Sequence, residues 1–257
     1  MPAHSLNELV SAFMFGMLRI GGVMVFAPFF GSQGIPMQVK AGFTLSLSLL
    51  LYPAYAPARW NLSPAGWTRI AFSEAAVGLL LGLTLSFVLE AAQFAGQVTG
   101  LQMGFSLVSE LDPQTQADTP VISIFHQLVV LLIFLQLNVH HWLLRGLAAS
   151  FAYLPPGQAW TRTVSFPDLL QAAGGIWLAG MQIAAPVLVA TVLTDIGLGF
   201  LGKASPQTPV LLLGLSLKAA LGMVILICSL RFWPSLFERY FSSAVRLGEQ
   251  LLQLQGS

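Results

Sequence analysis

Apolar residues run along the chain in six long segments, which short polar or proline-containing stretches separate. The segments fall near residues 9–30, 40–56, 70–108, 120–154, 175–202 and 210–232. Prolines stand at several of the boundaries, and proline ends or kinks a helix because it lacks an N–H and restricts the residue before it. The pattern predicts an all-α chain of integral-membrane-type helical hairpins, organised as one domain over residues 1–257.

The lengths of these segments do not match the thickness of a bilayer. A membrane span needs about 20 apolar residues, whereas the second segment is short and the third and fourth would each extend roughly 50–58 Å if unbroken. Helices of that length must tilt, break or project beyond the hydrocarbon, and a broken helix needs protein or water over its exposed backbone. Pro186 predicts a kink within the fifth segment.

The C-terminal stretch 235–255 has a different pattern, in which apolar residues recur at roughly helical spacing between polar ones. These residues are Leu236, Phe237, Tyr240, Phe241, Leu247 and Leu251. The spacing predicts an amphipathic helix that lies either on the membrane surface or against a partner, and we favour the surface.

Composition narrows the class of protein. Apolar residues make up 56% of the chain and charged residues 8%, against about 25% charged in soluble domains, so the chain belongs in a membrane or in an apolar assembly. The net charge of +1 and the lack of a basic stripe argue against nucleic acid. Cys228 is the single cysteine, which excludes intrachain disulfides. The N-terminus lacks a basic region, so we expect no cleavable signal peptide.

The stretch from Gly96 to Arg145 is the most distinctive, because two apolar arms flank a polar loop at residues 109–119. Small residues occupy every fourth position of the first arm: Ala92, Gly96, Gly100 and Gly104. They share one helix face and let another helix approach closely. The loop either occludes a channel or simply connects the arms; both interpretations stay open.

Ionisable residues inside apolar segments are costly and are candidates for function. They are Arg19, Glu74, Glu90, His126, His140, His141, Arg145, Asp195 and Lys218. They form either a proton relay or pairs within a packed bundle, and pairing is favoured because only three of them are acids.

No pattern in the chain supports an enzyme or a metal site. Asn138 and the adjacent His140 and His141 are the best candidate ligands, but neighbouring side chains on a helix point about 100° apart, and no carboxylate stands one turn away. Serine-nucleophile, phosphate-loop and HExxH motifs are absent from the sequence. We expect no catalytic residue, no metal and no cofactor.

A series of short motifs runs through almost the whole chain. The motifs are Arg19-Ile-Gly-Gly, Ala27-Pro28, Gly31, Pro36 and Lys40; Gly104-Phe105-Ser106, Asp112-Pro113, Pro120, Phe134 to His140, Ser150-Phe151 and Leu154-Pro155; and Asp195-Ile-Gly-Leu-Gly, Lys203, Ser205-Pro206-Gln207 and Gly214 to Lys218. Together they resemble the flagellar biosynthetic protein FliR family, which includes the T component of virulence type III secretion. Thr208-Pro209-Val210 and Ser216-Leu217-Lys218 depart from the family pattern, which affects the last hairpin only. The N-terminal stretch is more similar to the flagellar branch than to the virulence branch.

The resemblance implies a subunit of the flagellar export gate in the bacterial inner membrane, within the flagellar basal body. Such a subunit forms a helical channel with FliP- and FliQ-like membrane proteins, contacts lipid, works with an FlhB-like export switch protein and passes unfolded proteins. The family's plug loop corresponds to Met103–Thr119 here, with Met103, Gly104, Phe105, Ser106, Glu110, Asp112 and Pro113 as candidate pore residues. Candidate buried polar or packing residues are Arg19, Glu90, Gly96, Gly100, Asn138, His140, Asp195 and Lys218.

A small-solute secondary transporter is the alternative from a different class, and Glu74, Glu90, Asp195 and Lys218 motivate it. Transporters often consist of two related halves with interrupted helices in matching places, and the sequence has no clear symmetry of that kind. Co-purification with two other small apolar proteins favours the export subunit, whereas a monomer that binds a solute favours the transporter.

Overall fold

A computed structural model describes residues 6–31, 34–52, 63–105, 121–156, 166–205, 207 and 210–253. Every regular element in these ranges is a helix, so the predicted all-α class is confirmed. The helices are α1 (Leu6–Phe26), α2 (Met37–Leu51), α3 (Pro64–Gln102), α5 (Val121–Gln136), α6 (Val139–Tyr153), α7 (Phe166–Ala204), α8 (Val210–Leu230) and α9 (Trp233–Gln253).

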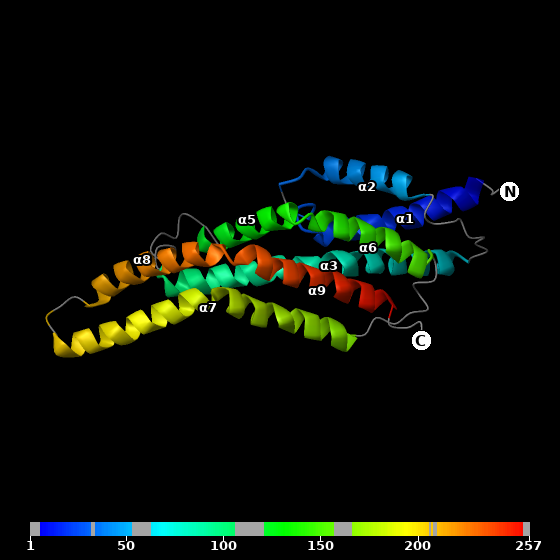
Figure 1. Ribbon diagram of the computed structural model, residues 1–257. Helices are drawn as coiled ribbons and strands as arrows, with labels where there is room; N and C mark the ends of the chain where they lie inside the picture. The colour runs from blue at the N-terminus through cyan, green and yellow to red at the C-terminus, as the bar shows by residue number, and fades with distance from the viewer. Residues whose placement is uncertain are drawn as a thin grey trace. The chain divides into compact units, whose positions relative to one another are not determined.

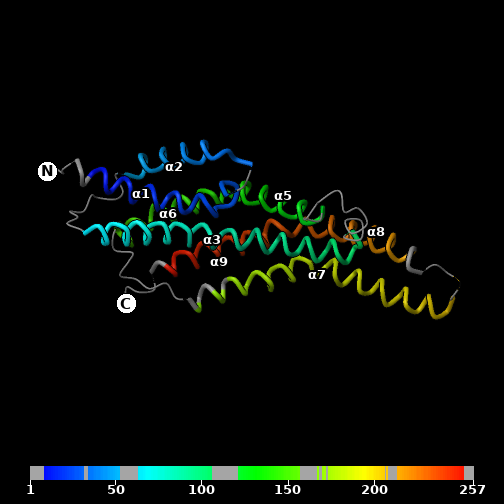
Figure 2. The backbone as a smooth tube through the Cα atoms, turned by 180° about the vertical axis from the view of Figure 1, so that it is seen from behind, coloured from blue at the N-terminus to red at the C-terminus, as the bar shows by residue number. Residues whose placement is uncertain are grey.

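Two of the helices are much longer than a bilayer requires. Helices α3 and α7 each contain 39 residues, which corresponds to about 58 Å at 1.5 Å per residue. Four described helices are long and apolar enough to cross a membrane, or five when α5 and α6 count as one bent span. Helix α7 continues through Pro186, and its axis changes direction near its middle (Figures 1 and 2).

The fourth apolar segment, predicted at 120–154, is not one helix but two. Helix α5 ends at Gln136 and α6 begins at Val139. Asn138 between them has a φ of 54°, in the left-handed region that asparagine tolerates better than most residues. This break lacks the prolines that mark the other boundaries, which is why the apolar pattern concealed it.

Contacts divide the chain into two compact units, each assembled from separated stretches of sequence. The first takes in Met1–Phe87, Asn138–Ala172 and Tyr240–Ser257, and the second takes in Val88–Leu137 and Ala173–Arg239. Because α3, α7 and α9 each contribute to both units, the expectation of a single domain stays a prediction.

The first unit packs α1 against α3 at two glycines. A Cβ on Gly22 would stand 2.6 Å from the Ala75 carbonyl oxygen, and a Cβ on Gly78 would overlap the Arg19 carbonyl oxygen. The backbones of α1 and α3 approach so closely at these two positions that glycine is required there.

Helix α2 runs beside α1 (Figure 1), and the rings of Phe30 and Phe43 stack with their centroids 4.8 Å apart.

The second unit leaves wide apolar surfaces uncovered on α7 and α8. In the most apolar stretches of these helices, only 28% of the residues are buried in α7 and 17% in α8, against 50% in α1 and in α3. Exposed residues include Leu178, Val189, Phe200, Val224 and Ile227. Surfaces of this kind suit lipid or a neighbouring subunit.

Helix α9 is the amphipathic C-terminal helix, and its apolar face is used within the chain. Phe237 and Phe241 are fully buried, and Ala244 and Leu251 are nearly so. A Cβ on Gly248 would stand 3.2 Å from Thr84 Oγ1 of α3. The preference for the membrane surface was therefore wrong, since the buried face packs on the chain's own helices.

Candidate functional site

The last turn of α3 forms a specific backbone stop at the start of the candidate plug loop. The Phe105 N–H donates to the Gly100 carbonyl at 2.9 Å, and the Gly104 N–H donates to the Leu101 carbonyl at 3.0 Å. Gly104 has a φ of +84°. This pair of hydrogen bonds with a left-handed glycine is the Schellman motif, which ends a helix and turns the chain away from its axis.

Helix α8 supports this turn from one side. Met103 is 1% exposed, and a Cβ on Gly222 would stand 2.6 Å from the Met103 Cγ. A Cβ on Gly104 would overlap Leu215 Cδ1. The base of the loop therefore lies against two turns of α8. Ser106, Glu110, Asp112 and Pro113 lie outside the described residues.

Helix α5 approaches α3 closely near the same end. A Cβ on Gly96 would stand 2.5 Å from the Ser123 Cα, and the Ser123 hydroxyl donates to the Gln93 carbonyl at 2.9 Å. Ala92 is fully buried and Gly100 is buried. Gly96, within the row of small residues of the first arm, thus lies where the two arms on either side of the loop touch.

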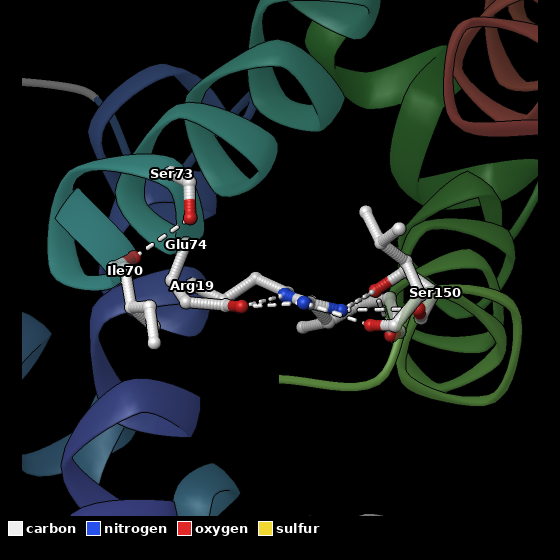
Figure 3. Close-up of polar contacts among 7 residues, drawn as sticks. Arg19, Ile70, Ser73, Glu74 and Ser150 are labelled. Carbon is white, nitrogen blue, oxygen red and sulfur yellow. Dashed lines mark hydrogen bonds and ion pairs between the residues drawn. The ribbon is translucent and has the colours of Figure 1, made fainter. Parts of the chain in front are cut away.

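Arg19 is the centre of a buried polar cluster in the first unit (Figure 3). Its Nε donates to Glu74 Oε2 at 2.7 Å, its Nη1 to the Ser150 carbonyl at 3.0 Å, and its Nη2 to the Leu154 carbonyl at 2.9 Å. The guanidinium carbon lies 4.5 Å from the centre of the Phe151 ring. One side chain of α1 therefore joins Glu74 of α3 to the C-terminal end of α6.

The cluster explains why arginine occupies this position. Arg19 and Glu74 are both fully buried, and a buried charge is tolerated only when it is paired and hydrogen-bonded. A planar guanidinium offers donors in several directions, which a lysine ammonium cannot match. The Leu154 carbonyl is available because α6 ends at Tyr153, and the last carbonyls of a helix have no partner within it.

Three sequence motifs of the family resemblance meet at this cluster. They are Arg19-Ile-Gly-Gly, Ser150-Phe151 and Leu154-Pro155. The sequence indicated each motif separately but gave no sign that they touch, because 131 and 135 residues separate Arg19 from Ser150 and Leu154. Glu74 was recognised as a buried charge, but not as the partner of Arg19.

Asp195 of α7 and Lys218 of α8 form a second ion pair, in the second unit. The Lys218 Nζ lies 2.9 Å from Asp195 Oδ2, and the two side chains are 19% and 50% exposed. The pair joins the two helices about one turn away from the close contact of Gly214 with Leu198. Its partial exposure leaves Asp195 able to accept a further donor from outside the chain.

The remaining candidates do not join either cluster. Asn138 is the left-handed residue before α6, and the rings of His140 and His141 lie 4.2 Å apart. Glu90 is exposed on the face of α3 that looks toward Trp177. No group of three metal-ligating side chains occurs within the described ranges. Glu74 is paired with Arg19, and Asp195 is paired with Lys218. Three of the four charges that motivated a transporter therefore lie in ion pairs within the chain.

Comparisons with known proteins point in one direction. The family described as bacterial export proteins, family 1, matches residues 10–244. The chain is 31% identical to the flagellar biosynthetic protein FliR of Bacillus subtilis (strain 168), over 98% of this chain and 99% of that protein. It is 28% identical to FliR of Escherichia coli (strain K12), over 93% and 91% respectively. It is 30% identical to FliR of Pectobacterium carotovorum, over 96% and 95%.

Proposed function

This chain belongs to the FliR family of bacterial export proteins, and from that membership we propose that it is a structural and gating subunit of the flagellar type III export gate. It is a non-enzymatic protein of flagellar biosynthesis, located in the inner membrane and the flagellar basal body. As a gate subunit it forms a helical channel with FliP- and FliQ-like proteins, and unfolded flagellar subunits pass through that channel. An FlhB-like protein selects the cargo.

The observation that carries the gating role is the support of the loop base by α8. Met103 is buried against Gly222, and Gly104 ends α3 beside Leu215. A loop that begins from a fixed, close-packed turn is held in position at its root, as a plug requires. Residues 106–120, which follow this root in the sequence, carry three acids and two prolines.

The structural role is supported by the apolar surfaces of α7 and α8. Most residues in the most apolar stretches of these two helices are not buried. Helix α7 also carries Asp195, whose side chain is 50% exposed. Hydrocarbon chains cover apolar side chains but cannot hydrogen-bond a carboxylate. A neighbouring protein subunit can cover both.

Co-purification tests the proposal. The tagged chain is expressed with its FliP- and FliQ-like neighbours, extracted in mild detergent and examined by native mass spectrometry. We expect one assembly that contains all three proteins. We also expect the gene for this chain to restore swarming in a strain whose own copy of the gene has been deleted. A stable monomer that binds neither protein would overturn the proposal.

A further inference from the structure

A hollow of about 270 Å³ lies between α3 and α7 in the second unit. Its lining residues are Glu90, Gln93, Phe94, Gln97, Ile176 and Trp177. The rings of Phe94 and Trp177 meet edge to face at 4.6 Å. Next to these rings, a Cβ on Gly180 would stand 2.9 Å from the Ala91 carbonyl oxygen, so α3 and α7 touch beside the hollow.

The hollow combines a carboxylate, two amides and an aromatic wall. Glu90, Gln93 and Gln97 share one face of α3, because residues three and seven apart lie on the same side of a helix. No cation in the described ranges pairs with Glu90. Glu90 is exposed and lies 12 residues before the end of α3, a helix long and apolar enough to cross a membrane. A carboxylate at such a position is costly, once lipid or a partner covers it, unless a cation meets it.

The chemistry of the hollow suits a guanidinium group. A guanidinium forms two parallel hydrogen bonds to a carboxylate and stacks on an indole ring. Its remaining N–H groups can donate to the amide oxygens of Gln93 and Gln97. A lysine ammonium satisfies the carboxylate but lacks the planar fork that matches the other walls.

The surface around the hollow indicates where the cation comes from. Trp177, Leu178 and Met181 are 63%, 65% and 46% exposed, so the rim is apolar. A partner that covers this rim must itself be apolar, and it must place one basic side chain in the hollow beside Glu90.

We propose that this hollow receives an arginine side chain from an apolar helix of a neighbouring gate subunit, and that Glu90 is its counter-charge. The inference rests on the proposed function, since it requires an assembly of several apolar subunits. It adds a specific recognition site on α3 and α7 that the loop does not involve.

Photo-crosslinking tests the occupant directly. The photoreactive residue p-benzoyl-phenylalanine is placed at Ile176 while Glu90 stays intact, membranes are irradiated, and the crosslinked peptides are sequenced by mass spectrometry. We expect a peptide of another subunit with an arginine within one helical turn of the attachment point. Attachment only to lipid, only within the chain, or to a peptide without a basic residue would overturn the proposal.

Charge reversal tests the counter-charge. We expect Glu90→Lys to lower the fraction of chain recovered with its partners at least about tenfold, and Glu90→Gln to lower it several-fold, because an unmatched interfacial charge weakens binding strongly. Glu238→Lys reverses an exposed glutamate on α9 and serves as the control with wild-type recovery. Glu90→Arg combined with a glutamate at the crosslinked arginine is expected to restore recovery.

Recovery of the Glu90→Lys chain at the wild-type level would contradict the proposal and leave the gate function intact. Failure of the wild-type chain to form any assembly would instead contradict the gate function itself. The two failures are therefore distinguishable in one set of preparations.

Discussion

The side chain of Met103 lies against Gly222 of α8, so that a Cβ on residue 222 would stand 2.6 Å from the Met103 Cγ and 3.0 Å from its sulfur. Met103 is the last residue before the left-handed Gly104, where α3 ends. The position at which the candidate plug loop leaves its helix is thus fixed by a contact with a helix that lies more than a hundred residues further along the sequence.

Replacement of Gly222 is expected to disturb this contact. Gly222→Ala forces Met103 to repack, and overpacking of this kind costs about 1–3 kcal/mol. We expect a lower thermal midpoint of the purified assembly, measured by intrinsic fluorescence. Gly197→Ala on α7 is the matched control, because a Cβ there meets no atom of the described part of the chain within 4 Å.

The combination of Gly222→Ala with Met103→Ala identifies the cause. The smaller side chain leaves room for the new methyl group, so the double variant should lose less stability than the sum of the single variants. Strict additivity would show that Gly222 and Met103 do not interact.

Gly96 is expected to be intolerant of any side chain. A Cβ at this position would stand 2.5 Å from the Ser123 Cα and 3.0 Å from the Ile122 carbonyl oxygen, and these backbone atoms cannot rotate away. Gly96→Ala should therefore separate α3 from α5 and reduce swarming. Cells with Gly146→Ala should swarm normally, because a Cβ at Gly146 meets no described residue within 4 Å. Normal swarming by Gly96→Ala would mean that the two helices do not approach as described.

The Arg19 cluster predicts a marked asymmetry between single and double variants. Arg19→Met leaves the Glu74 carboxylate buried without its cation, and loss of one partner of a buried pair costs about 3–5 kcal/mol. Combining it with Glu74→Met removes the unpaired charge and should recover much of that loss, as judged by protein level in the membrane and by thermal midpoint. Arg19→Lys should not rescue, since one ammonium cannot reach Glu74 and both carbonyls together.

Arg246→Met is the control for the loss of an arginine as such, because Arg246 is exposed and, among the described residues, donates a hydrogen bond only to Ser243 Oγ at 3.3 Å. Equal losses for Arg19→Met and Arg246→Met would contradict the importance of the cluster.

Variants of His126 distinguish a role in packing from a role in a proton relay. The side chain is fully buried, its Nδ1 lies 2.8 Å from the Ile122 carbonyl oxygen, and its Nε2 has no hydrogen-bond partner among the described residues. Its ring lies 4.9 Å from that of Trp233. His126→Phe keeps the ring contact and should support normal swarming, whereas His126→Ala opens a cavity and should cost about 3 kcal/mol. Loss of export in a stable His126→Phe protein would favour the relay.

Local patterns in the sequence were sufficient to predict the helices but not the contacts between them. Continuous apolar residues and the absence of proline predicted the length of α3, and helical spacing predicted α9. The break at Asn138 was missed because a single asparagine gives no signal inside an apolar run. The partners of Arg19 were missed for a different reason, since a guanidinium can be satisfied by backbone carbonyls anywhere in the chain.

Local patterns in the sequence could not predict the hollow beside Glu90 either. Glu90 was recognised as a costly charge, yet its setting depends on Trp177, which is 87 residues away along the chain, and on the contact between Gly180 and Ala91. A contact between two long apolar helices leaves no trace in either helix beyond a glycine.

The ion permeability of cells that carry a loop deletion tests the central claim most directly. Residues 110–117 are deleted, the assembly with FliP- and FliQ-like proteins is verified by co-purification, and sodium or proton leakage across the inner membrane is measured. If the loop that starts at Met103 and Gly104 closes the pore, the deletion should leave the assembly intact and make the membrane leak. An intact assembly with the permeability of wild-type cells would contradict the account.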